Sequence, residues 1–150
     1  MLDAIDKQLL LEKILDLNYL PDGAYHIRKN GQDIERINTE NISIVPKKGQ
    51  AGIDVTVKPG TRGETIYLFS LMSQPVADLV YNTFEIGANA NIVIMAGYTL
   101  TDPEIFQQQV VNKFIVQENA KLKYIEKHSV DGVCQRVLNQ KNILSVEKSG

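Results

Sequence analysis

Two segments of the chain repeat each other at an offset of thirty residues. Residues 82–95 read NTFEIGANANIVIM and residues 112–125 read NKFIVQENAKLKYI, and they align without a gap. A fixed period of roughly 20–50 residues is typical of solenoids, in which each unit buries its apolar face against its neighbours. The repeat therefore predicts stacked β-coils. The identical pairs are Asn82 with Asn112, Phe84 with Phe114, Asn89 with Asn119 and Ala90 with Ala120.

The small turn inside each repeat predicts a sharp corner. Asn89 and Asn119 tolerate the left-handed backbone conformation that such a corner needs, and the alanine that follows each leaves room for the next coil. In this arrangement the strands of successive coils pair in parallel, and Phe84 stacks directly above Phe114. Antiparallel pairing of these segments would exclude the solenoid.

The same frame continues towards the C-terminal residue of the sequence. Asn142, Leu144 and Val146 fall thirty residues after the equivalent positions of the second repeat, and Gly150 reaches the place of Ala120. We expect a solenoid that ends in mid-coil. An open coil exposes backbone groups and an apolar stack, which favours pairing with another chain. The sequence therefore predicts a homodimer interface at Asn142, Leu144 and Val146.

The rest of the chain predicts a mostly β, single domain over 1–150. Apolar residues at three-to-four-residue spacing predict a helix over 1–20, docked on the body or binding a partner. Asn30-Gly31 predicts a tight turn in a hairpin over 24–37. From residue 42 onward, short apolar–polar alternations separated by turn residues predict strands, so that the solenoid spans 42–150.

Composition narrows the classes of partner. Sixteen basic and eighteen acidic residues give a net charge of −2, which provides no broad attraction for nucleic acid or an anionic membrane surface. No apolar run approaches the roughly eighteen residues of a membrane-spanning helix. The single cysteine, Cys134, favours a reducing cytoplasm over a disulfide-stabilised secreted domain.

Few residues are candidates for chemistry. The chain has no phosphate-binding glycine loop and no serine–histidine–acid arrangement. His128 and Cys134 are six residues apart and are the candidate metal ligands, the alternative being a surface histidine and an inert thiol. Glu126 and His128 share one face if their segment is a strand. We expect no catalytic site, so the protein should neither hydrolyse ATP nor cleave polysaccharide.

Short motifs spread along the chain resemble the SufB/SufD family of iron–sulfur cluster assembly proteins. They begin in the predicted hairpin and reach the end of the second repeat. The motifs are Gly23-Ala24-Tyr25-His26-Ile27-Arg28, Asn30-Gly31, Thr39-Glu40-Asn41-Ile42, Gly52-Ile53-Asp54, Val57-Lys58-Pro59-Gly60-Thr61, Gly63-Glu64, Val80-Tyr81-Asn82, Phe84, Ile86-Gly87, Val93-Ile94, Ala96-Gly97, Tyr124-Ile125-Glu126-Lys127-His128, Gly132 and Arg136-Val137-Leu138-Asn139.

The resemblance implies a right-handed parallel β-helix. It also implies a non-catalytic scaffold that works with a SufC-type ABC ATPase and a SufB/SufD-type subunit, and that meets an iron–sulfur cluster through these partners. Two features depart from the family pattern. Tyr98-Thr99-Leu100-Thr101 stands where short family members have Cys-Gly-Ile-His after Ala-Gly, and the C-terminal helical region that docks the ATPase has no counterpart after Gly150.

Two other functions stay open at this point. One is a structural or regulatory β-solenoid without cluster chemistry, which the replacement of Cys-Gly-Ile-His favours. The other is a carbohydrate-active β-helix protein, which would need an aromatic-lined groove and clustered acidic or basic catalytic groups. The chain has no tryptophan and no such cluster in its sequence.

Overall fold

The computed structural model describes residues 23–30, 32–72, 77–100, 105–130 and 135–146, and these residues form ten strands and no helix. The helix predicted over 1–20 falls outside them. The strands are β1 (Tyr25–Lys29), β2 (Gln32–Ile37), β3 (Ile42–Pro46), β4 (Ile53–Val57), β5 (Arg62–Met72), β6 (Ala77–Ile86), β7 (Asn91–Leu100), β8 (Ile105–Val116), β9 (Lys121–Val130) and β10 (Gln135–Val146).

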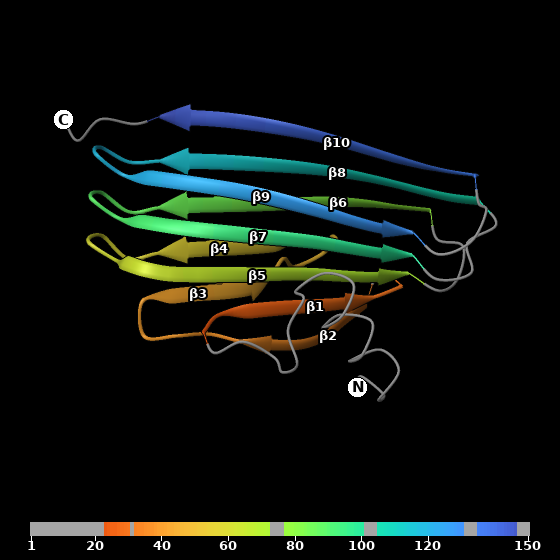
Figure 1. Ribbon diagram of the computed structural model, residues 1–150, viewed down its shortest axis with the longest axis horizontal. Helices are drawn as coiled ribbons and strands as arrows, with labels where there is room; N and C mark the ends of the chain where they lie inside the picture. The colour runs from red at the N-terminus through yellow and green to blue at the C-terminus, as the bar shows by residue number, and fades with distance from the viewer. Residues whose placement is uncertain (1–22, 31, 73–76, 101–104, 131–134, 147–150) are drawn as a thin grey trace.

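The strands form two five-stranded sheets that face each other (Figure 1). One sheet, here sheet A, has the order β2-β1-β5-β7-β9, and the other, sheet B, has the order β10-β8-β6-β4-β3. From β4 onward the chain alternates between the sheets, and from β6 onward each strand pairs in parallel with the strand two before it. The described part of the chain is therefore mostly β and mostly parallel.

The thirty-residue repeat of the sequence equals the offset between paired residues in the two sheets. Asn82 pairs with Asn112 and Phe84 with Phe114 between β6 and β8, and β8 pairs with β10 at the same offset. Sheet A keeps this offset between β7 and β9. The prediction of parallel pairing between the repeated segments is confirmed.

The offset between paired residues falls below thirty towards the N-terminal strands. Val55 pairs with Phe84, an offset of 29, while Glu64 pairs with Ile92, an offset of 28. The second value follows from a bulge between Arg62 and Glu64, where Gly63 has a φ of 74°. Such a bulge places an extra residue in one strand. The sequence repeat is therefore not detectable before residue 82.

The corners between β6 and β7 and between β8 and β9 are stacked in the same way. Asn89 and Asn119 have φ values of 62° and 61°, which confirms the left-handed conformation predicted for them. The backbone N–H of Asn89 donates to the carbonyl of Glu118 at 3.0 Å, and that of Gly60 donates to Ala88 at 2.9 Å. Backbone hydrogen bonds between adjacent turns therefore continue the pairing of the strands.

The N-terminal end of the stack is antiparallel. β1 and β2 form the hairpin that Asn30-Gly31 predicts, with Asn30 at a φ of 50°. β3 also runs antiparallel to β4, because only a short loop connects them, whereas β1 pairs in parallel with β5. Charged residues on β2 and Pro46 on β3 lie at the two sheet edges, where they disfavour pairing with further strands.

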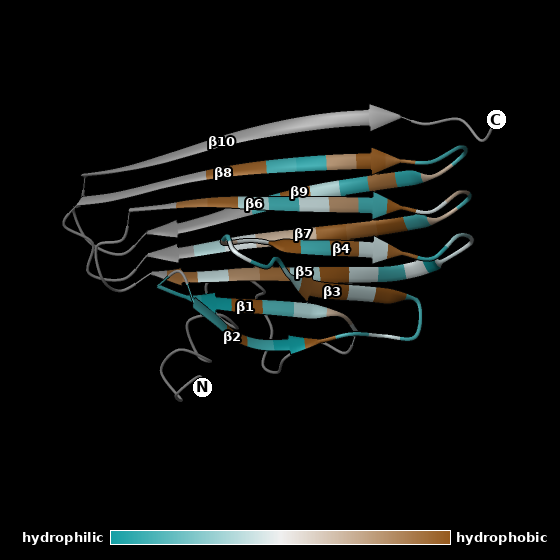
Figure 2. Cartoon of the chain, turned by 180° about the vertical axis from the view of Figure 1, so that it is seen from behind, coloured by the Kyte–Doolittle hydropathy of each residue, from teal (hydrophilic) through white to brown (hydrophobic). Residues whose placement is uncertain are grey.

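The core fills the space between the two sheets. Phe84 and Phe114 stack with ring centroids 4.9 Å apart and planes inclined by 13°, as the repeat predicts. Aliphatic side chains surround them, and hydrophilic residues lie along the strands as well as in the turns (Figure 2). The fully buried side chains in this core include Ile42, Ile44, Ile66, Ile86, Ile92 and Ile94.

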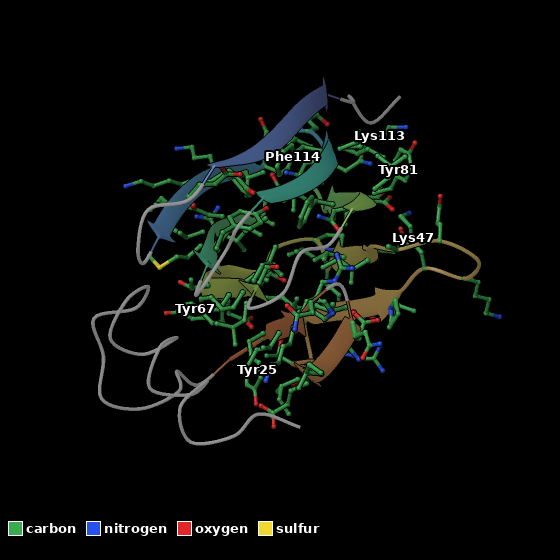
Figure 3. All side chains as sticks on the ribbon, turned by 90° about the vertical axis from the view of Figure 1, so that its right-hand side faces the viewer. Tyr25, Lys47, Tyr67, Tyr81, Lys113 and Phe114 are labelled. Carbon is green, nitrogen blue, oxygen red and sulfur yellow. The ribbon has the colours of Figure 1, made fainter. Side chains whose placement is uncertain are left out.

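The outer faces of the sheets carry different side chains. Viewed along the strands, Tyr81, Lys47 and Lys113 lie on one side of the molecule, and Tyr25 and Tyr67 on the other (Figure 3).

Within the residues described, no helix has the length and apolar character needed to cross a membrane.

Candidate functional site

The candidate metal ligands are only partly covered by the structure. The backbone of His128 lies on β9, in register with Tyr98 of β7, and Cys134 lies outside the described residues. A contact between His128 and Cys134 therefore stays a prediction. The described residues contain no group of three or more His, Cys, Asp and Glu that could hold a metal ion.

The predicted interface residues lie on an edge strand. β10 is the last strand of sheet B, and its backbone places Asn142, Leu144 and Val146 in register with Asn112, Phe114 and Val116 of β8. The thirty-residue frame therefore extends to β10. The predicted homodimer stays a prediction.

A small cavity of about 40 Å³ lies between the two sheets. Sheet A contributes His26, Leu68, Ser70, Ala96 and Tyr98 among its walls. Sheet B closes the other side. Of the remaining lining residues, Arg28, Phe69, Gly97 and Tyr124 belong to sheet A, and Ile53, Val80, Asn82 and Val110 to sheet B.

A chain of hydrogen bonds crosses the interior beside this cavity. The side-chain oxygen of Asn82 accepts from the backbone of Ile53 at 3.2 Å, and its amide nitrogen donates to Asn112 Oδ1 at 3.0 Å. Asn112 in turn donates to the hydroxyl of Tyr124 at 3.5 Å, and that hydroxyl donates to Glu126 at 2.7 Å. The two sheets are thus connected by buried polar groups as well as by apolar contacts.

One row of residues in sheet A brings three polar side chains to the cavity. Arg28 pairs with Ser70, and Ser70 pairs with Tyr98, on three adjacent strands. Arg28 is 8% exposed. Its Nε has no acceptor within hydrogen-bond distance, although the guanidinium takes part in other interactions. A buried positive charge therefore borders the cavity.

Both tyrosines at the cavity stay protonated. Burial raises the pKa of Tyr98, and the negative charge of Glu126 adds to the rise, while Arg28 opposes it. Burial also raises the pKa of Tyr124, with further contributions from Tyr98 and from Glu126. Both hydroxyl groups are therefore neutral and able to donate hydrogen bonds at physiological pH.

His26 lines both this cavity and a second pocket between the hairpin and the end of β3. The outer pocket, about 320 Å³, is lined by His26, Asp33 and Pro46 among others. His26 Nε2 lies 2.7 Å from Asp33 Oδ1. Burial lowers the pKa of His26, and Arg28 and Arg36 act in the same direction, although the contact with Asp33 opposes them. The imidazole is therefore neutral at neutral pH.

A bulge in the hairpin places Asp33 beside His26. The register passes from Ile27–Glu35 directly to Arg28–Asp33, so that Ile34 is the extra residue. Opposite residues in an antiparallel pair share a face, and successive residues alternate between faces. Without the bulge, Asp33 would stand opposite Lys29 and would point away from His26.

The sequence interpretation did not identify this cavity. Arg28 entered only as part of a family motif, and Tyr98 only as a departure from one. Two signals were present: the asparagine that recurs among apolar positions at Asn82 and Asn112, and the tyrosine at 124 where the first repeat has Ile94. Both mark polar groups at inward positions.

The comparisons with known proteins add no relative: no family model, no curated protein and no solved structure matches the chain.

Proposed function

We propose that the chain is a non-catalytic scaffold component of the Suf iron–sulfur cluster assembly machinery, folded as a right-handed parallel β-helix. The observation that carries this proposal is the thirty-residue parallel register of β6, β8 and β10. A solenoid offers long, regular surfaces for partner proteins. The motifs that resemble the SufB/SufD family extend over the same strands.

In this proposal the partners are a SufC-type ATPase and a SufB/SufD-type subunit in the cytoplasm, and the iron–sulfur cluster is the cargo of the complex. The edge strand β10 joins a second subunit of the same kind, either another copy of the chain or a SufB/SufD-type partner. β10 is favoured because the described residues place no strand on its outer side, and such an edge can add a strand.

The test is co-purification of the tagged chain with the two subunits, expressed together without oxygen. We expect both partners to be retained and the complex to show the visible absorption of an iron–sulfur cluster. Leu144→Lys should release the SufB/SufD-type subunit, whereas the control Lys113→Ala, at an exposed position in the neighbouring strand, should retain it. Loss of both partners from the unaltered protein would contradict the scaffold role.

A second candidate function is a structural or regulatory solenoid without cluster chemistry. It is favoured by Tyr98, which lines the interior cavity at the position where the resemblance calls for a cysteine. Partner subunits that are retained without any iron or sulfide in the complex would support this candidate over the first.

A further inference from the structure

Two apolar side chains on the outer face of sheet A are buried. Ile66 belongs to the core and Leu68 packs against it, so Phe69, the next residue of β5, points outward by the alternation of side chains along a strand. Its ring centroid lies 6.0 Å from that of Tyr67, which lies on the outer side in Figure 3. Ile27 pairs with Phe69 and shares this face. Ile27 is nevertheless 0% exposed and Phe69 is 2% exposed.

The two sheets differ in this respect. Leu79 and Tyr81, at outward positions of β6 in sheet B, are 44% and 38% exposed, as expected for the open face of a sheet. The neighbour of Phe69 on β7 is Gly97, which has no side chain to shield the aromatic ring. The burial of Ile27 and Phe69 therefore requires a further layer over sheet A.

The first 22 residues are the segment that can supply this layer. All ten described strands belong to the two sheets, so none of them lies over the outer face of sheet A. Every other segment outside the described residues has at most four residues, whereas residues 1–22 directly precede β1. Nine of these 22 residues are leucine or isoleucine. We propose that residues 1–20 dock on the outer face of sheet A and cover Ile27, Phe69 and Leu71, which is 3% exposed.

The width of the buried strip fits a single helix. At outward positions next to this strip, Met95 of β7 is half-buried and Lys123 of β9 is exposed, so the cover ends between these two strands. The distance from β1 to β7 is two strand spacings, about 10 Å, which is close to the diameter of a helix. The helix predicted over 1–20 would be about 30 Å long, enough to follow about nine residues of a strand.

The proposal assigns one face of the molecule to a contact within the chain. A contiguous apolar face that stays open favours association with other molecules, and the docked segment removes the face of sheet A from such contacts. Partner proteins are then left with the outer face of sheet B and the edge strand β10. The inference holds whether or not the chain acts as a Suf scaffold.

The experiment uses the absence of tryptophan from the chain. Phe69→Trp introduces one tryptophan under the proposed cover, and the control Tyr81→Trp introduces one on the outer face of sheet B. We expect the fluorescence of Phe69→Trp to lie at short wavelength and to resist quenching by acrylamide at every protein concentration. The added replacements Leu9→Gln, Leu10→Gln and Leu11→Gln should shift this emission to longer wavelength and increase the quenching several-fold. They should leave the emission of Tyr81→Trp unchanged.

Three results would overturn the proposal. They are the emission of a water-exposed tryptophan from Phe69→Trp, a buried emission that the leucine replacements do not alter, and a buried emission that is lost on dilution, which would identify a second copy of the chain as the cover. If the leucine variant does not fold, NMR of the unaltered chain decides. Nuclear Overhauser contacts from the Phe69 ring to methyl groups of residues 1–20 support the docked segment, and contacts to methyl groups of the sheets alone contradict it.

Discussion

The side-chain amide of Asn82 donates a hydrogen bond of 3.0 Å to the side-chain oxygen of Asn112, its counterpart thirty residues later. Asn112 is 1% exposed and Asn82 is half-buried, so this contact lies in the interior. A slip of one residue between β6 and β8 would move one of the two amides to the outer face and break this contact. The pair therefore favours the observed register of the two strands.

Removal of this amide should be costly. Asn112→Ala leaves the amide nitrogen of Asn82 and the hydroxyl of Tyr124 without their present partner. A buried polar group left unsatisfied costs about 1–3 kcal/mol, and we expect a loss of this size in the free energy of unfolding, measured by urea denaturation. Lys113→Ala, the exposed neighbour in the chain, serves as control. Equal stability of the two variants would show that the amide ladder contributes nothing.

The stacked phenylalanines should contribute more than the amides. Phe84 is 0% exposed and lies against Phe114, and truncation of a buried phenylalanine to alanine costs about 3–5 kcal/mol. Phe84→Ala should therefore lower the unfolding midpoint strongly or prevent folding. Tyr81→Ala, on the same strand but 38% exposed, should cost less than about 1 kcal/mol. A small effect of Phe84→Ala would argue against a packed core between the sheets.

The corner at Asn89 allows a test of backbone conformation alone, since this side chain is exposed. A β-branched residue at a φ of 62° is strained by about 1–2 kcal/mol, so Asn89→Val should destabilise the protein by that amount. Asn89→Gly should be tolerated, because glycine adopts this conformation without strain. Denaturation curves of the two variants check the difference, with Lys121→Val on an exposed strand position as control. The prediction fails if valine and glycine at 89 are equivalent.

Acid should destabilise the protein partly through His26. The folded state lowers the pKa of His26 below its ordinary value of 6.5, so the unfolded chain takes up this proton first as the pH falls. The contribution of the neutral imidazole is therefore fully present above about pH 6.5 and is lost as the pH drops through the lowered pKa. His26→Gln should reduce this decline in the free energy of unfolding.

Asp33→Asn should act in the opposite direction to His26→Gln. Asp33 raises the pKa of His26 towards its ordinary value, so its removal should lower that pKa further and should extend the loss of stability to lower pH. His128 is present in both variants, so that its own titration cancels in the comparison. Parallel pH profiles of the unaltered protein and His26→Gln would show that His26 does not titrate on unfolding.

The parts of the fold that repeat were predictable from the sequence. The inward side chains of one repeat must fit those of the next, so residues at the same positions recur after thirty residues. This recurrence predicted the pairing of Asn82 with Asn112 and the stacking of Phe84 on Phe114. It also predicted the left-handed backbone conformation of Asn89. The first strands were less predictable. The bulge at Gly63 changes the offset of sheet A, and a short loop turns β3 antiparallel to β4, so neither strand repeats the pattern.

The interior cavity was not predictable because its residues come from segments without a shared pattern. Arg28 belongs to the N-terminal hairpin, before the repeat begins, while Tyr98 lies on β7 and Tyr124 on β9. Only the register of sheet A brings Arg28 beside Ser70 and Tyr98. No residue type in the sequence marks the bulge that places Asp33 beside His26.

The alternation of the chain between two sheets restricts how such a protein can change length in evolution. Among the described residues, β8 pairs with β6 and β10, and β7 pairs with β5 and β9, so that each strand contacts the equivalent strands of the neighbouring repeats. Duplication or deletion of thirty residues therefore preserves every inward position, whereas gain or loss of a single residue within a strand exchanges the buried and the exposed face. Relatives of different size should consequently differ by whole thirty-residue repeats, and shorter insertions should be confined to the turns.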